Sequence, residues 1–347
     1  MNSRPAEPRS ILIVRLSAMG DLVFTTPLLS SLRARFPQAR ICWLVRKELA
    51  PLLAEDPDLD EVIVWTPPKG HGWLPHWRSL RKRLQPYQFD WVIDAQGLLK
   101  SRIVASAASG WRLGFDSKEP ARWLMHELLP KQGDNSLIGS EYRWLAEQLT
   151  DQPSQPPRLR ISARAREQVS EQCQNLGLQS QPIIVCPFTT RAQKHWPEEY
   201  WPQLIAGLTE RFNVPVLMMG GPADRAAATR IQNQLGEAGG RLINLVGQTS
   251  ISDTPAWIAR ARLLVGVDTG LTHMGAALAR PTIALFGSTC PYTDGARGPL
   301  KVMYEGLSCA PCRRRPSCDG AFTCLRLLTP ERVLATAQSL LRGAEMS

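Results

Sequence analysis

Three short polar stretches contain the side chains that could bind and transform a phosphorylated ligand. The first ends at Asp21, whose carboxylate could serve as a general base. The second, Pro187–Trp196, supplies two hydroxyl groups, from Thr189 and Thr190, and the ammonium group of Lys194. Hydroxyl and ammonium donors suit the oxygens of a pyrophosphate. These two stretches therefore predict a base and an anion-binding loop.

The third polar stretch follows the apolar run Leu263–Val267 and opens a helix. Its candidate ligand-binding residues are Asp268, Thr269, Gly270, Thr272 and His273. A helix that begins directly after a parallel strand points unpaired N–H groups at the crevice where open α/β sheets bind phosphates. Glycine at the helix start lets a ligand approach the backbone. The stretch predicts a donor site for an anion, with an ordinary βαβ turn as the alternative.

Each of these residues also has a purely structural interpretation. Asp21 could cap a helix, and Lys194 could be a solvated loop lysine. The G-x-G-x-x-G fingerprint of dinucleotide-binding proteins and the P-loop do not occur at either turn, which argues against a dehydrogenase or a kinase. A G-x-S-x-G elbow and an H-E-x-x-H pair are also absent from the sequence.

The elements that position these stretches form two alternating βαβ series. Short apolar runs predict strands at Ile11–Arg15, Ile41–Val45, Val62–Trp65 and Trp91–Asp94, and again at Ile183–Cys186, Val214–Met218, Leu242–Asn244, Leu263–Val267 and Thr282–Phe286. The Pro-rich segment Asp151–Arg160 between the series reads as a linker. We expect an N-terminal domain over 1–160, a second over 161–328, a cleft between them, and a C-terminal helix over 329–347 that packs back toward the first domain.

Composition and charge limit the classes of protein to which the chain could belong. The chain of 347 residues carries a net charge of +10, which attracts anionic partners. The sequence has no apolar run of about 18 residues and no apolar segment behind its polar N-terminus, so we expect a cytoplasmic protein. A nucleic-acid-binding protein is an alternative from another class, but the sequence has no matching motif.

The basic stretch His71–Tyr87 has two interpretations. Its apolar residues recur at helical spacing, and four cations, Arg78, Arg81, Lys82 and Arg83, accompany them. One interpretation is a helix packed on the sheet with a solvated basic face. The other is an aromatic-flanked surface that meets anionic lipid headgroups. The two are compatible.

Half of the eight cysteines cluster near the C-terminus, at Cys309, Cys312, Cys318 and Cys324. The spacing C-x₂-C-x₅-C-x₅-C offers four thiolates, the number that holds zinc or an iron–sulfur centre. A structural metal, a disulfide pair and free thiols all remain open. None of the three makes the cluster catalytic.

Four segments resemble the bacterial lipopolysaccharide heptosyltransferases, glycosyltransferase family 9. They are Arg15–Leu29 (RLSAMGDLVFTTPLL), Asp94–Ser101 (DAQGLLKS), Thr189–Glu198 (TTRAQKHWPE) and Asp268–Leu278 (DTGLTHMGAAL). They occur in the family's order and span both halves of the chain. The second and third are most similar to the heptosyltransferase I branch.

The resemblance implies a GT-B fold of two Rossmann-like domains, with the acceptor bound by the N-terminal domain and the donor by the C-terminal one. It implies inverting transfer of L-glycero-D-manno-heptose from ADP-heptose to the Kdo of inner-core lipid A at the inner leaflet of the cytoplasmic membrane, without a required metal. Asp21 matches the catalytic aspartate and Lys100 lies in the acceptor segment. Thr189, Thr190 and Lys194 match donor-phosphate residues, and the Asp268–His273 turn matches the donor-binding turn.

The chain departs from heptosyltransferase I in two places. Where that branch has a glutamate for the donor ribose, the nearest carboxylate here is Asp224, and the cysteine-rich tail has no counterpart. Alternatives are therefore another nucleotide-sugar donor, a later core acceptor as in heptosyltransferases II and III, or a non-catalytic anion-binding relative.

Overall fold

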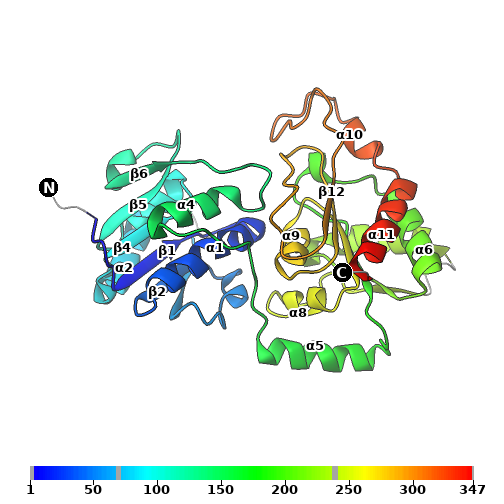
Figure 1. Ribbon diagram of the computed structural model, residues 1–347, viewed down its shortest axis with the longest axis horizontal. Helices are drawn as coiled ribbons and strands as arrows, with labels where there is room; N and C mark the ends of the chain where they lie inside the picture. Colours follow the sequence, from blue (N-terminus) through cyan, green and yellow to red (C-terminus); the bar gives the residue numbers. More distant parts are fainter. Residues whose placement is uncertain (1–3, 68–71, 237–240, 346–347) are drawn as a thin grey trace. The chain divides into compact units, whose positions relative to one another are not determined.

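The computed structural model describes residues 4–67, 72–236 and 241–345, and the chain divides into two compact units (Figure 1). Unit 1 comprises residues 1–134 and 139–160, and unit 2 comprises residues 135–138 and 161–347. Within the described residues, each unit is built on one six-stranded parallel sheet. The predicted fold class, two Rossmann-like α/β domains, is confirmed.

The sheet of unit 1 has the strand order β3-β2-β1-β4-β5-β6. Its strands are β1 (Ser10–Val14), β2 (Arg40–Arg46), β3 (Glu61–Trp65), β4 (Trp91–Asp94), β5 (Trp111–Asp116) and β6 (Glu127–Pro130). Ile13 of β1 lies opposite Trp43 of β2 and Ile93 of β4, and all three are buried. The strand order reverses between β1 and β4, and such a switch point is where open α/β sheets bind ligands.

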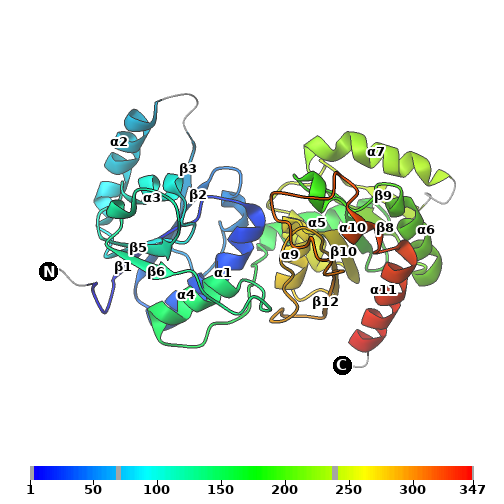
Figure 2. The ribbon, with the colours of Figure 1, turned by 90° about the horizontal axis from the view of Figure 1, so that it is seen from above.

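Helices cover both faces of this sheet. They are α1 (Met19–Arg35), α2 (Trp73–Leu84), α3 (Leu99–Ala105) and α4 (Ser140–Thr150), with the short 3₁₀ helices η1 (Ala50–Leu52), η2 (Gln85–Tyr87) and η3 (Arg122–Leu124). α1 packs on α4, whereas α2 and α3 lie together over another part of the sheet (Figure 2). Leu80 and Leu84 of α2 enter the core there, as the helical spacing predicts. His71, at the start of that prediction, lies outside the described residues.

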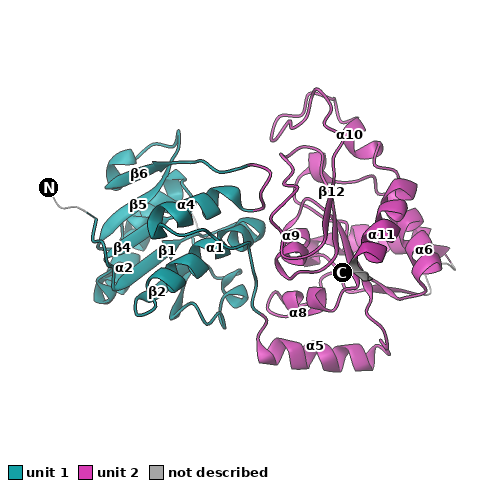
Figure 3. Cartoon of the chain, viewed as in Figure 1, with its two compact units in different colours: residues 1–134, 139–160 teal, residues 135–138, 161–347 magenta. Residues whose placement is uncertain are grey.

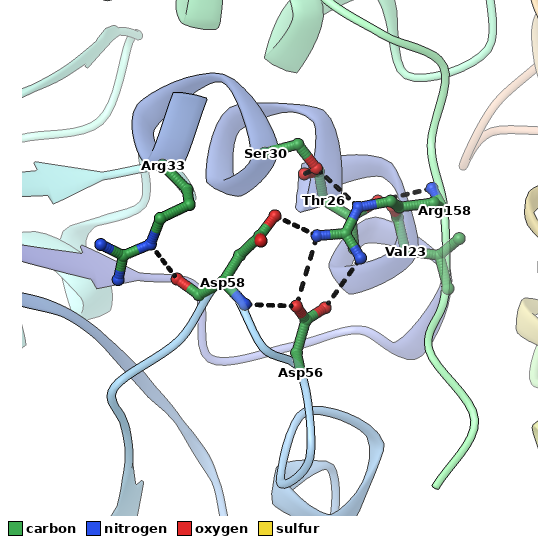
Figure 4. Close-up of polar contacts among 7 residues, drawn as sticks. All are labelled: Val23, Thr26, Ser30, Arg33, Asp56, Asp58 and Arg158. Atoms are coloured by element: carbon green, nitrogen blue, oxygen red, sulfur yellow. Dashed lines mark hydrogen bonds and ion pairs between the residues drawn. The ribbon is translucent and has the colours of Figure 1, made fainter. Parts of the chain in front are cut away.

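Arg158 connects the end of unit 1 to its first helix through hydrogen bonds (Figure 4). Its backbone N–H donates to Oγ1 of Thr26 at 2.9 Å, and its Nε donates to Oγ of Ser30 at 2.8 Å. The buried guanidinium also pairs with the carboxylates of Asp56, at 3.3 Å, and Asp58. This buried network connects the predicted linker to α1 and to the segment that precedes β3.

Unit 2 repeats the same topology. Its strands are β7 (Ile183–Cys186), β8 (Val216–Met218), β9 (Leu242–Asn244), β10 (Leu263–Val267), β11 (Thr282–Leu285) and β12 (Leu300–Met303). Their order, β12-β11-β10-β7-β8-β9, is that of unit 1 read from the other edge. The switch point therefore lies between β7 and β10, which run parallel with Val185 opposite Val265.

The helices of unit 2 include the C-terminal one. They are α5 (Ala163–Asn175), η4 (Ala192–Lys194), α6 (Tyr200–Phe212), η5 (Pro222–Asp224), α7 (Arg225–Gln234), α8 (Thr254–Ala259), α9 (Gly270–Ala277), α10 (Thr323–Arg326) and α11 (Pro330–Glu345). α11 lies beside α6 in unit 2 (Figure 3). Its Val333, Leu334, Ala337 and Leu341 join the core of that unit. The apolar stripe of this helix is thus buried within unit 2, and the expectation that the helix packs back toward the first domain stays a prediction.

Three strands, β5, β6 and β12, lack the apolar runs that predict a strand. β5 contains Arg112 and Gly114, and β12 contains the exposed Lys301, as befits an edge strand. Gly114 is required because a Cβ there would lie 2.6 Å from the carbonyl oxygen of Asp94 on the neighbouring strand. Over the described ranges, none of the helices is both long enough and apolar enough to cross a membrane.

Candidate functional site

The switch point of unit 2 brings two of the predicted stretches together. β7 leads into the loop that carries Lys194, and β10 leads into the turn that begins at Asp268. Because β7 and β10 are hydrogen-bonded neighbours, both loops leave the sheet at the same edge. Nζ of Lys194 lies 2.6 Å from Oδ2 of Asp268. Residues 74 positions apart in the sequence thus form one cluster.

Asp268 is the centre of this cluster. Its side chain is 7% exposed, and its Oδ1 lies 3.2 Å from Nε2 of His273. Its Oδ2 accepts from Thr289 as well as pairing with Lys194. Burial alone would raise the pKa of this carboxyl, but the hydrogen bond and charge of His273, together with Lys194, hold the pKa well below its usual range. Asp268 is therefore ionised, and its contacts orient the groups around it.

His273 lies one turn into α9, between Asp268 and a buried tyrosine. Its Nδ1 is 2.7 Å from the hydroxyl of Tyr292, whose ring also packs against Phe286. Burial, and then the charge of Asp268, raise the pKa of Tyr292 well above its ordinary value. The neutral phenol and the carboxylate hold the imidazole from both sides, which fixes the orientation of its ring.

The remaining predicted donor residues differ in their exposure. Thr190 is exposed, and half-buried Thr189 donates to the carbonyl of Asp268 at 3.4 Å. Thr269 is the N-cap of α9 and Gly270 its first residue, and both are half-buried. Thr272 is fully buried, and its hydroxyl donates to the carbonyl of Val267 at 2.6 Å, so it serves the turn itself. A Cβ at position 266 would lie 2.2 Å from that hydroxyl, which explains the glycine there.

The loop after β11 adds residues that the sequence analysis missed. Thr289 bonds Asp268 and Tyr292 contacts His273, as described above. Ser288 is 1% exposed, and its Oγ has no hydrogen-bond partner within the described part of the chain. The signal that could have found them is the polar sequence directly after a predicted strand, since β11 neighbours β10 in the sheet.

The turn after β1, at the switch point of unit 1, has a different electrostatic character. The buried guanidinium of Arg15 pairs with Asp21, whose side chain is 45% exposed, and donates to the carbonyl of Ala95 at 3.1 Å. Burial lowers the pKa of Arg15, but Tyr142 and Asp21 raise it above its ordinary value, so the guanidinium stays charged. Asp21 also accepts from the backbone N–H of Ala18 at 3.3 Å, so it does cap α1. The cap leaves its carboxylate open to solvent.

Lys100 follows β4, the neighbour of β1 across the switch point of unit 1. Its Nζ lies 5.1 Å from the ring centre of Trp65 and 6.0 Å from that of Trp73. Both rings also line a small pocket beside α2 and α3. The predicted acceptor-binding lysine is therefore held over an aromatic surface by cation–π contacts.

Asp224, the nearest carboxylate to the expected ribose contact, accepts from the backbone N–H of Gly221 at 2.8 Å. It caps its own short turn, η5, and lies after β8, one strand away from β7. A role toward a ribose stays a prediction.

The cysteine-rich segment adjoins the donor loops. Gln193 donates to the carbonyl of Arg313 at 2.9 Å, and the N–H of Arg313 donates to the carbonyl of Ser288 at 2.5 Å. Cys309, Cys312, Cys318 and Cys324 are all free thiols. Among the described residues, no three or more His, Cys, Asp or Glu side chains are arranged to hold a metal ion. A structural metal at these cysteines stays a prediction, which metal analysis of anaerobically purified protein tests.

Known proteins resemble this chain over nearly its whole length. Lipopolysaccharide heptosyltransferase 1 of Pseudomonas aeruginosa is 29% identical, with 96% of this chain and 99% of that protein covered. The structure of Escherichia coli ADP-heptose lipopolysaccharide heptosyltransferase II is 26% identical, with a TM-score of 0.79 and coverage of 97% and 99%. Escherichia coli heptosyltransferase WaaC with ADP-2-deoxy-2-fluoro heptose is 25% identical, with a TM-score of 0.70 and coverage of 95% and 99%.

The family described as "Glycosyltransferase family 9 (heptosyltransferase)" matches residues 77–321, which include Lys100 and the whole of the Asp268 cluster. The match extends from α2 of unit 1 to the cysteine-rich segment of unit 2. The chain belongs to glycosyltransferase family 9, and it is a glycosyltransferase.

Proposed function

We propose that this enzyme transfers L-glycero-D-manno-heptose from ADP-heptose to the Kdo of the lipopolysaccharide inner core. The observation that carries the proposal is the Asp268 cluster, in which Lys194 and the first turn of α9 lie together at the switch point of unit 2. A cation and a helix N-terminus suit a diphosphate. The WaaC structure, which contains an ADP-heptose analogue, supports this choice of donor.

Asp21 acts as the general base in the proposed mechanism. Its carboxylate is exposed, and Arg15 and the N–H of Ala18 hold it at the end of β1. It removes the proton of the acceptor hydroxyl as that oxygen attacks the anomeric carbon of heptose, and the bond to the ADP phosphate breaks on the opposite face. The configuration inverts, and general-base catalysis contributes about 10²–10⁴ in rate.

Lys194 and the backbone N–H groups that follow Thr269 stabilise the departing ADP. The leaving phosphate gains negative charge as the glycosidic bond breaks, and fixed donors are most effective where charge develops. In this scheme Asp268 is a positioning residue, because both of its oxygens are already paired with Lys194, His273 and Thr289. We propose that no metal ion is required, and turnover in the presence of EDTA tests this.

Mass spectrometry of the product tests the donor and the acceptor together. Purified enzyme is incubated with ADP-heptose and Kdo-lipid A, and we expect a product heavier by one heptose. Parallel reactions with UDP- and GDP-sugars test the alternative donors. Heptose transfer from none of these donors, or transfer only from UDP- or GDP-sugars, would refute the proposal.

A later core acceptor is the second candidate. Of the two Escherichia coli structures that resemble this chain, that of heptosyltransferase II has the higher TM-score. The same assay with an acceptor that already carries one heptose separates the two activities. We expect the acceptor without heptose to react faster, and the reverse ratio of kcat/KM would assign the later step. A lipid-linked acceptor places the enzyme at the cytoplasmic face of the inner membrane, as a peripheral protein.

A further inference from the structure

Exposed apolar side chains gather around one helix of unit 1. Of the large hydrophobic residues that are exposed in the described chain, four lie in elements that contact α3 or belong to its start: Trp73 (37% exposed), Leu74 (56%), Leu98 (44%) and Trp123 (80%). Trp73 and Leu74 begin α2, Leu98 precedes α3, and Trp123 lies in η3. Apolar groups clustered on the surface of a folded unit mark an interaction site.

Helix α2 adds a basic face to these residues. The helix contains no acidic residue, and Arg78, Arg81, Lys82 and Arg83 are all exposed. Arg81 stacks on Trp77, and Arg83 donates to the carbonyl of Val64. Arg78 and Lys82 make no hydrogen bond or ion pair within the described residues.

The packing of α2 keeps this face directed outward. Nε1 of Trp77 donates to Oγ of Ser106 at 3.0 Å, and Leu80 and Leu84 are buried in the core of unit 1. At 100° per residue, Leu74, Arg78 and Lys82 then follow one another along the exposed side. Figure 2 shows α2 lying along the outside of unit 1, with α3 beside it.

We infer that Trp73, Leu74, Leu98 and Trp123, together with the basic face of α2, form a docking surface for an anionic lipid bilayer. Tryptophan and leucine side chains enter the boundary between headgroups and acyl chains, and cations beside them pair with lipid phosphates. Two of the four exposed apolar residues, Leu74 and Leu98, are aliphatic, which suits acyl chains but offers no ring on which a base could stack, so the surface fits a bilayer better than nucleic acid. The surface goes beyond the proposed transfer reaction and does not depend on its donor or acceptor.

Sedimentation with lipid vesicles tests this surface. The full-length protein is mixed with vesicles of phosphatidylcholine alone or with about 30% phosphatidylglycerol, a charged fraction chosen to give a negative surface potential. The vesicles contain no lipopolysaccharide and no nucleotide, so failure of the proposed reaction does not affect the result. We expect binding to the anionic vesicles only, and its loss in about 0.5 M salt, where charges are screened.

A matched pair of variants locates the surface. Leu74→Ser with Arg78→Gln and Lys82→Gln removes two cations, each of which contributes a factor of about five near an anionic surface, so binding weakens by about 30-fold or more. The control combines Leu176→Ser with Arg164→Gln and Arg166→Gln, which are also exposed positions, on α5 of unit 2 and at its end. We expect the control to bind as the wild type does. Undiminished binding of the α2 variant, equal loss in the control, or wild-type binding without a preference for anionic vesicles would each overturn the inference.

Discussion

Each unit carries an aspartate after a strand that borders its switch point, and the two carboxylates have opposite surroundings. In unit 1, Asp21 follows β1, is 45% exposed and pairs with one cation, Arg15. In unit 2, Asp268 follows β10, is 7% exposed and contacts Lys194, His273 and Thr289. The two switch points thus hold one carboxylate that is accessible to a substrate and one that is committed to neighbouring side chains, although β10 is the counterpart of β4 and not of β1.

The two units also differ in the location of their buried ion pairs. In unit 1 the network of Arg158, Asp56 and Asp58 is formed by other residues than the turn that carries Asp21. In unit 2 the buried charges are those of the turn itself. The Arg158 network of unit 1 can therefore be mutated without altering the turn that carries Asp21, whereas in unit 2 a change at the turn affects both stability and chemistry.

Asp21→Asn should have the largest effect of these variants, because it removes the proposed general base of unit 1. The amide retains the shape and an acceptor for Arg15 but cannot take a proton, so we expect kcat to fall by about 10²–10⁴-fold with little change in the KM for donor. Asp60→Asn is the matched control, because Asp60 is 46% exposed and pairs with Arg33. Steady-state kinetics of both variants measure the effect. Near-normal turnover of Asp21→Asn would show that Asp21 is not the general base.

Arg158→Met tests the structural half of the comparison in unit 1. Removing the guanidinium leaves the carboxylates of Asp56 and Asp58 without their buried partner, which costs about 3–5 kcal/mol in free energy of unfolding. We expect the thermal unfolding transition of unit 1 to move to lower temperature, while kcat of the folded enzyme is retained below that transition. A large loss of kcat with unchanged stability would show that the network serves catalysis instead.

Lys194→Ala should affect binding and turnover together. The ammonium group is proposed to contact the phosphate before and during transfer, so we expect kcat/KM to fall by about 10²-fold, with both parameters changed. Lys301→Ala, at an exposed position on the edge strand β12, is the control. Kinetics at varied donor concentration measure the effect, and an unchanged response to donor would exclude this lysine from the donor site.

The sequence predicted the strands next to each switch point because they are buried on both faces and read as apolar runs. β4, β7, β9 and β10 begin and end where the sequence placed them. It did not predict β5, β6 or β12, whose polar residues and glycine break the run, and it therefore could not give the strand order.

Without the strand order, the side-chain contacts of the site could not be predicted either. Lys194 and Asp268 were proposed as separate ligands, but the adjacency of β7 and β10 pairs them directly. Arg15, read only as the end of a strand, proved to be the partner of Asp21. Side-chain pairing across neighbouring strands depends on sheet topology, which local patterns in one sequence do not contain.

The smallest expected effect is a pH dependence of the stability of unit 2, which arises from Asp268. Because the pKa of this carboxyl is depressed in the folded protein, its contribution to stability is complete above the unfolded value near 3.8 and is lost as the pH falls toward the folded value. Asp268→Asn lacks this titration. The stability difference between the wild type and Asp268→Asn should thus shrink by about 1 kcal/mol between pH 6 and pH 3.

Thermal or urea unfolding followed over that pH range measures the effect, and Glu198→Gln provides its control. A hydrogen bond from Arg230 lowers the pKa of Glu198, but this pair is exposed, so screening by water makes its contribution to stability small. We therefore expect a nearly constant difference for Glu198→Gln and a shrinking one for Asp268→Asn. Parallel pH curves for the two variants would mean that the Asp268 cluster behaves like a surface ion pair, and the contrast between the two turns would then rest on exposure alone.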